Sequence, residues 1–191
     1  MIYELKNKNL KLEVDSFGAE AIHLVYKGIN YLRDRDEVWD RTAPILFPIV
    51  GRLKDGYSYY NDFKIELGVH GFAAHRDFKL KEIKDDEIIF IDTYDDDTLK
   101  LYPYKYQLEV SYKITKNKVT TSIKVTNLDE VSYKYNIGGH PGFVCPLFKG
   151  ENFEDYRIIF NQKETFASPS IVNASTLDFD HPSFEFIHIA P

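Results

Sequence analysis

Apolar and polar side chains alternate most regularly between residues 106 and 126. On residues 106–114 every second position is apolar or aromatic, and residues 119–126 repeat the pattern after a turn at residues 116–118. A period of two indicates half-buried strands, because successive strand side chains point to opposite faces. We therefore predict a long antiparallel hairpin with one dry face here.

Shorter segments elsewhere share this strand signature. They are residues 10–15, 21–26 with a turn at 27–30 leading into 31–32, 57–60, 63–67, 78–83, 87–93, 132–137 and 156–160. A short helix is expected over residues 95–100, with acidic residues near its amino end. Because no long helical period is present, the pattern predicts an all-β fold, an antiparallel β-sandwich or a related double-sheet structure.

Composition narrows the class of protein further. The 191 residues suit a single domain spanning 1–191, and 43% hydrophobic residues suit a globular chain. A net charge of -6 without a basic stripe argues against nucleic-acid and anionic membrane partners. The one cysteine, Cys145, excludes an internal disulfide and a cysteine-based zinc site. No signal-like or membrane-spanning apolar run is present, so a cytoplasmic location is expected.

Residues 41–53 form an apolar segment that contains Pro44 and Pro48. Prolines in such a run argue against both a helix and a central strand. A buried apolar loop of this kind is expected to line a pocket. Arg52, which follows Gly51, could direct its guanidinium group toward hydroxyls or a phosphate, whereas a surface ion pair is the plainer interpretation.

Two histidines lie in separate glycine-rich loops. His140 sits between a pair of glycines and Pro141, and the proline favours an extended conformation for it. His70 precedes Gly71 in the other loop. Glycine lacks a Cβ, so another group can approach the backbone closely. Imidazole exchanges protons near neutral pH, and a sheet that carries both loops could bring the two rings to one site.

Three motifs together resemble a known family. Leu46-Phe47-Pro48-Ile49-Val50-Gly51-Arg52-Leu53, His70-Gly71-Phe72 and Gly138-Gly139-His140-Pro141-Gly142-Phe143 resemble the aldose 1-epimerase (galactose mutarotase-like) family and, within it, the LacX-type branch. The resemblance implies a large antiparallel β-sandwich, or supersandwich, with a sugar cleft across one sheet. It also implies an isomerase that interconverts the α and β anomers of a free aldohexose without a cofactor or metal.

The resemblance also implies roles for particular residues. His140 would act as the general acid that protonates the ring oxygen, and His70 would bind and polarise the same region. Arg52 would hold sugar hydroxyls, and His75 receives no role. The general base of the family is a glutamate near the carboxyl end; this chain has no matching motif, because Glu185 lacks the expected neighbours.

The missing glutamate leaves alternatives open. The chain is shorter than its relatives, so it is either a natural short form or a fragment, with a sandwich incomplete at the carboxyl end. Exposed sheet edges would then favour a homo-oligomer. A non-catalytic carbohydrate-binding or regulatory module is one alternative function. A hexose-phosphate epimerase is another, and it would need Arg52, Lys54 and Arg76 as a basic cluster.

Overall fold

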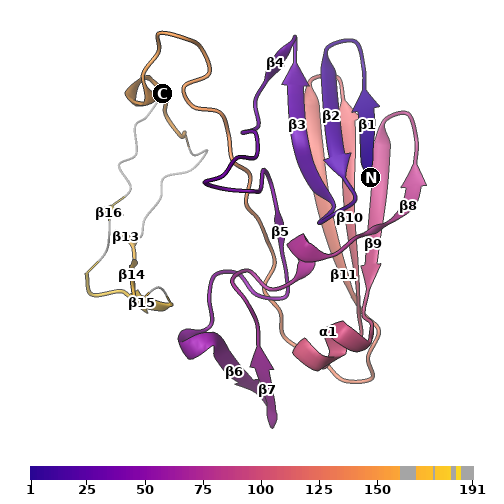
Figure 1. The fold of residues 1–191 in the computed structure, drawn as a ribbon, viewed down its shortest axis with the longest axis vertical. Coiled ribbons are helices and arrows are strands. Elements are labelled where there is room, and N and C mark those ends of the chain that lie inside the picture. The colour runs from indigo at the N-terminus through magenta and orange to yellow at the C-terminus, as the bar shows by residue number, and fades with distance from the viewer. Residues whose placement is uncertain (160–166, 174, 182–183, 186–191) are drawn as a thin grey trace.

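A computed structural model describes residues 1–159, 167–173, 175–181 and 184–185. In these residues two four-stranded antiparallel sheets lie face to face (Figure 1). One has the order β1-β2-β3-β4 and the other β11-β10-β9-β8. Their bounds are β1 (Ile2–Lys6), β2 (Leu10–Asp15), β3 (Glu20–Tyr26), β4 (Ile29–Asn30), β8 (Lys79–Ile83), β9 (Glu87–Thr93), β10 (Tyr106–Thr115) and β11 (Lys118–Asn127). The prediction of an all-β antiparallel sandwich is confirmed.

Shorter pairs of strands accompany the sandwich. They are β5 (Ile45–Leu46) with β12 (Gly138–Gly139), β6 (Tyr57–Tyr60) with β7 (Phe63–Glu66), β13 (Ala167–Ser168) with β16 (Phe184–Glu185), and β14 (Ser170–Val172) with β15 (Thr176–Asp178). Helical turns cover Lys54–Gly56, Ala73–His75 and Phe153–Asp155, and α1 covers Asp96–Leu101. The β6–β7 hairpin projects below the two sheets in Figure 1.

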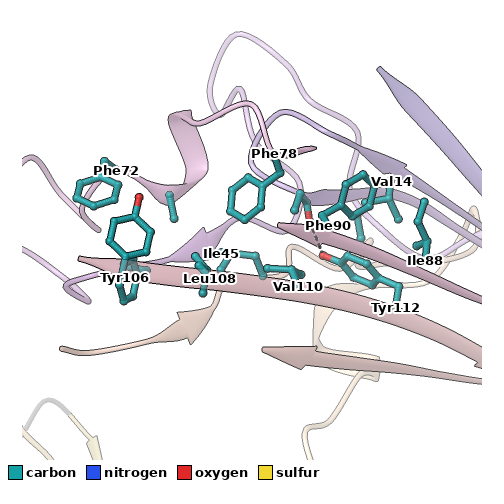
Figure 2. Close-up of a cluster of buried hydrophobic side chains, with 14 of the residues drawn as sticks. Val14, Ile45, Phe72, Phe78, Ile88, Phe90, Tyr106, Leu108, Val110 and Tyr112 are labelled. Atoms are coloured by element: carbon teal, nitrogen blue, oxygen red, sulfur yellow. Dashed lines mark hydrogen bonds between the residues drawn. The ribbon is translucent and has the colours of Figure 1, made fainter. Parts of the chain in front are cut away.

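The core fills the space between the two sheets. Figure 2 shows Val14 of β2 near Ile88 and Phe90 of β9, with Tyr112 of β10 beside them. The alternate apolar positions of β10, from residue 106 to 114, are at most 3% exposed. Full burial of such a side chain stabilises a fold by about 1.5–3 kcal/mol. The Tyr112 hydroxyl also donates to the carbonyl of Ala19 at 2.8 Å.

The predicted long hairpin is formed by β10 and β11. Its register pairs Tyr106 with Asn127 and Thr115 with Lys118, so the turn lies at residues 116–117. The apolar residues of β11, including Ile123 and Val125, are only half-buried. They are less covered than those of β10 because β11 is an edge strand of its sheet.

The short helix predicted near residue 95 is also present. Asp95 caps α1, because its Oδ1 accepts the backbone N–H groups of Asp97 at 3.1 Å and Thr98 at 2.9 Å. Thr98 Oγ1 in turn accepts the N–H of Asp95, which completes a capping box. The acidic residues before the helix therefore serve its first turn.

Three predicted strand segments differ from the structure. Residues 132–137 form no ladder: the N–H of Asn136 donates to the carbonyl of Pro48 at 2.9 Å, but Pro48 has no N–H to return. Residues 156–159 are not in a strand and follow the helical turn that ends at Asp155, while Phe160 lies outside the described residues. The strand expected at 31–32 lies instead at Ile29–Asn30, because the turn closes at Lys27 and Gly28, and residues 31–32 are outside it.

Candidate functional site

An apolar segment, residues 44–51, lies between the two histidine loops, and we call it the spine; its residues 44–48 are buried. Phe47 is 0% exposed and packs against Phe72 and Tyr106, with ring centroids 6.0 and 5.1 Å away. Its carbonyl accepts the N–H of Phe72 at 3.0 Å and of Ala73 at 3.2 Å. The prolines of this segment limit its regular strand to the two residues of β5.

The His140 loop follows one side of the spine. Gly138 pairs with Leu46 and Gly139 with Ile45, in antiparallel register. The N–H of His140 then donates to the carbonyl of Pro44 at 3.1 Å. The spine therefore fixes the backbone that carries the His140 side chain.

The His70 loop follows the other side of the spine. The N–H of His70 donates to the carbonyl of Gly51 at 2.8 Å. Gly71 has φ +75°, and a Cβ on it would lie 2.3 Å from the carbonyl oxygen of Phe47. Only glycine tolerates both the left-handed conformation and this close approach. The glycine next to His70 thus lets the loop lie directly against the spine.

The two imidazoles meet at a small cavity. The ring centroids of His70 and His140 are 5.6 Å apart, with the ring planes tilted by 57°. Both rings line a cavity of about 170 Å³, together with Trp39, Arg41 and His75. Pockets for drug-sized ligands have volumes of roughly 300–1,000 Å³, so this cavity suits a smaller molecule.

His70 is held as a neutral hydrogen-bond donor. Its Nδ1 accepts the N–H of Gly51 at 3.0 Å, so the proton of the neutral ring is on Nε2. Burial, and secondly the charge of His140, lower the pKa of His70. His70 can therefore offer an Nε2–H group without carrying a charge.

Arg52 lies outside this cavity. Its side chain is exposed and lines a neighbouring cavity with Lys54, Val69 and Thr176. Val69, the residue before His70, lines both cavities. The structure thus brings His70 and His140 together and places Arg52 on the adjoining surface.

Arg76 is engaged elsewhere. Its Nη2 contacts Asp92 at 3.0 Å and Asp95 at 2.7 Å. Burial lowers the pKa of Arg76, but the hydrogen bonds to Asp92 and Asp95 more than offset this, so the pKa is raised. Arg52, Lys54 and Arg76, the basic residues near the motifs, therefore do not line the cavity of the two histidines.

Sequence reasoning missed Arg41 and His75 as cavity residues. Arg41 donates from Nη1 to the carbonyl of Ala74 at 3.0 Å and from Nη2 to His75 Nδ1 at 2.7 Å. Its side chain is mostly buried, with Glu20 Oε2 3.7 Å from Nη1. Arg41 therefore holds the side chain of His75 at the cavity.

Glu20 organises this part of the site from the core. It is 0% exposed and accepts the N–H groups of Thr42 at 2.5 Å and Ala43 at 2.8 Å, while Arg35 donates to it at 2.7 Å. A buried carboxylate needs such partners. An acidic residue between Ala19 and Ala21 was the sequence signal for this role.

The described residues contain no group of three or more histidine, cysteine, aspartate or glutamate side chains arranged to hold a metal ion. In the same part of the chain, no helix has the length and apolar character needed to cross a bilayer.

Comparison with known proteins identifies the family. Residues 1–188 match the model of the aldose 1-epimerase family. The plasmid-encoded and chromosomal LacX proteins of Lactococcus lactis subsp. lactis are each 32% identical over 208 residues, covering 96% of this chain and 70% of theirs. The chain belongs to the aldose 1-epimerase family, and LacX proteins are among its relatives.

Solved structures agree with this assignment. A galactose mutarotase related enzyme from Lactobacillus acidophilus superimposes with a TM-score of 0.90 at 31% identity. The match covers 96% of this chain and 62% of that enzyme, so the chain spans less than two thirds of its length. A galactose mutarotase-like protein from Lactobacillus casei superimposes with a TM-score of 0.73 at 31% identity, over 75% of this chain and 50% of that one.

Proposed function

We propose that this protein is an aldose 1-epimerase that interconverts the α and β anomers of a free hexose. The observation that carries the proposal is the pair of imidazoles, 5.6 Å apart, at one small cavity. Opening a pyranose ring requires a proton on the ring oxygen and the loss of another from the anomeric hydroxyl. Two adjacent groups that exchange protons near neutral pH suit this reaction.

In this proposal His140 delivers the proton to the ring oxygen. Its side chain is exposed at the cavity, and a hydrogen bond from its backbone N–H to the carbonyl of Pro44 holds the main chain in place, so the ring can contact a ligand. A positioned acid or base typically contributes about 10²–10⁴-fold to the rate. His70 donates its Nε2–H to an oxygen of the same sugar, and its neutral state avoids repulsion with a protonated His140.

The anomeric proton also needs an acceptor. Among the described residues that line the cavity, Asp40 is the carboxylate, and its side chain is 86% exposed. We propose Asp40, acting directly or through water, as the base of this chain. Arg52 then holds sugar hydroxyls only if the ligand extends past Val69 into the neighbouring cavity.

The test is anomer exchange on freshly dissolved α-glucose and α-galactose, followed by polarimetry or NMR. The proposal expects exchange faster than in buffer, and slower exchange in Asp40→Asn than in the wild type. A wild-type rate equal to that of buffer would show that this chain lacks the proposed epimerase activity.

A carbohydrate-binding module without turnover is the second candidate. The exposure of Asp40 favours it, because a hydrated carboxylate is a weaker base than one held in a dry site. Titration with aldoses, monitored through NMR shifts, separates the two functions. Shifts without exchange would support the module, and no shift at millimolar sugar would exclude it.

A hexose-phosphate substrate has less support. The basic residues expected to bind a phosphate, Arg52, Lys54 and Arg76, do not line the cavity of the two histidines.

We also propose that β11, an edge strand with half-buried apolar residues, pairs with a second copy of the chain. Light scattering on the full chain measures that association.

A further inference from the structure

Trp39, the single tryptophan of the chain, lies against His140. The centroids of the two rings are 5.2 Å apart, and their planes are tilted by 55°. Both side chains line the cavity that also holds His70. The imidazole of His140 therefore has the indole as one neighbour and the imidazole of His70 as another.

The backbone of Trp39 is fixed by a charged turn. Asp36 Oδ1 accepts the N–H of Trp39 at 3.0 Å, and Arg33 Nη1 donates to the carbonyl of Trp39 at 3.0 Å. Arg33 also bridges to Asp36 at 2.5 Å. The hydrogen bond from Trp39, and then that from Arg33, lower the pKa of Asp36, which keeps the carboxylate charged at neutral pH.

The indole fits against a glycine in the His140 loop. A Cβ on Gly142 would lie 2.7 Å from Cζ3 of Trp39. The carbonyl of Gly142 accepts the N–H of Arg33 at 2.9 Å, and the guanidinium carbon of Arg33 lies 5.5 Å from the Trp39 ring. Arg33 thus ties the loop that carries His140 to the turn that carries Trp39.

We propose that Trp39 is a positioning residue for His140 and the aromatic wall of the sugar cavity. That the ligand is a sugar rests on the proposed function, whereas the contact between the Trp39 and His140 rings does not. An exposed imidazole can rotate about its side-chain bonds, and the indole limits that freedom. An aromatic ring also offers a flat apolar surface to the C–H face of a pyranose. A misplacement of about 1 Å in a catalytic group can cost about 10²-fold in rate.

The first experiment uses the emission of Trp39 without sugar. A charged imidazole quenches a neighbouring indole more strongly than a neutral one, so the emission of Trp39 should rise in a step where the imidazole in contact with it loses its proton. Asp40, Arg41 and His75 also line the cavity, so each variant is compared with the wild type. The step should persist in His70→Gln and His75→Gln and disappear in His140→Gln. A step that survives in His140→Gln would overturn the proposal.

The second experiment compares Trp39→Phe and Trp39→Leu in anomer exchange. Trp39→Leu should lower kcat/KM by about 10–100-fold, through both kcat and KM, and Trp39→Phe should recover part of the loss. Gly142→Ala leaves Trp39 in the sequence but displaces its ring, so it should lower kcat as well. Normal kcat and KM in Trp39→Leu, whatever its melting temperature, would reduce Trp39 to a structural residue.

The two experiments separate the failure of each proposal. A wild-type exchange rate equal to buffer, with a His140-dependent emission step, removes the epimerase activity and leaves the ring contact in place. Activity without the emission step removes the positioning role of Trp39 and leaves the epimerase.

Discussion

The backbone N–H of Gly51 donates to Nδ1 of His70 at 3.0 Å, and the N–H of His70 donates to the carbonyl of Gly51 at 2.8 Å. This reciprocal pair joins the end of the spine to the first cavity histidine. It fixes the tautomer, because a ring nitrogen that accepts a hydrogen bond carries no proton. Protonating Nδ1 would break the hydrogen bond from Gly51. This cost disfavours the charged ring, which agrees with the lowered pKa of His70.

Stability should fall in mild acid because of His70. Its pKa in the unfolded chain is about 6.5, and the folded pKa is lower. As the pH falls through 6.5 the unfolded state takes up the proton first, so the free energy of unfolding decreases until the folded pKa is passed. Denaturant unfolding between about pH 5 and 8 measures this slope. His70→Gln should flatten it; equal slopes in the wild type and His70→Gln would contradict the prediction.

Gly71→Ala should destabilise the fold more than Gly28→Ala. Both glycines have positive φ, +75° and +84°, so both substitutions add the left-handed strain of about 1–2 kcal/mol. A Cβ at Gly28 meets nothing within 4 Å, whereas one at Gly71 meets the Phe47 carbonyl oxygen at 2.3 Å. Chemical denaturation of both variants isolates the clash, and equal losses would show that the His70 loop does not need this close approach.

Glu20→Ala should cost about 3–5 kcal/mol, the range for breaking a buried ion pair. The substitution leaves the N–H groups of Thr42 and Ala43 without their acceptor and uncouples Arg35. Glu13→Ala in the neighbouring strand is the control, and it should cost less than about 1 kcal/mol because its partners are solvent-accessible. Urea unfolding measures both, and similar small losses would show that Glu20 does not anchor the spine.

Tyr106→Phe should cost about 1.5–3 kcal/mol, the range for a hydrogen bond to a charged group. The Tyr106 hydroxyl donates to Asp92 Oδ2 at 2.6 Å, and both residues are buried. Burial, followed by the charge of Asp92, raises the pKa of Tyr106, so it remains a donor throughout the usual pH range. Tyr59→Phe, at a side chain 64% exposed, should change the free energy of unfolding little. If Tyr106→Phe leaves the free energy of unfolding unchanged, the ion pair with Arg76 is sufficient to stabilise the buried Asp92 carboxylate.

The sequence predicts most of the sandwich because its strands bury one face. Alternation marks a strand only where the two faces meet different surroundings, as on β10 and β2. The same signal overpredicted a strand at residues 132–137, because alternation says nothing about the pairing partner. There the neighbour is Pro48, which cannot donate to a ladder.

The site was less accessible to sequence reasoning. The motifs found both histidines, because glycine and proline fix loop geometry locally. Trp39 and Arg41 were missed because their positions depend on partners far away in sequence, such as Gly142 and Glu20. Charged irregular segments show no period from which such contacts could be inferred.

A double-mutant cycle on anomer exchange tests the central claim, that His70 and His140 act on one sugar from one cavity. The rates of the wild type, His70→Gln, His140→Gln and the double variant are compared on α-galactose. If the rings act as a unit, each single variant slows exchange, and the double variant is no slower than the more damaged single variant. Losses that multiply independently, or single variants as fast as the wild type, would contradict the account.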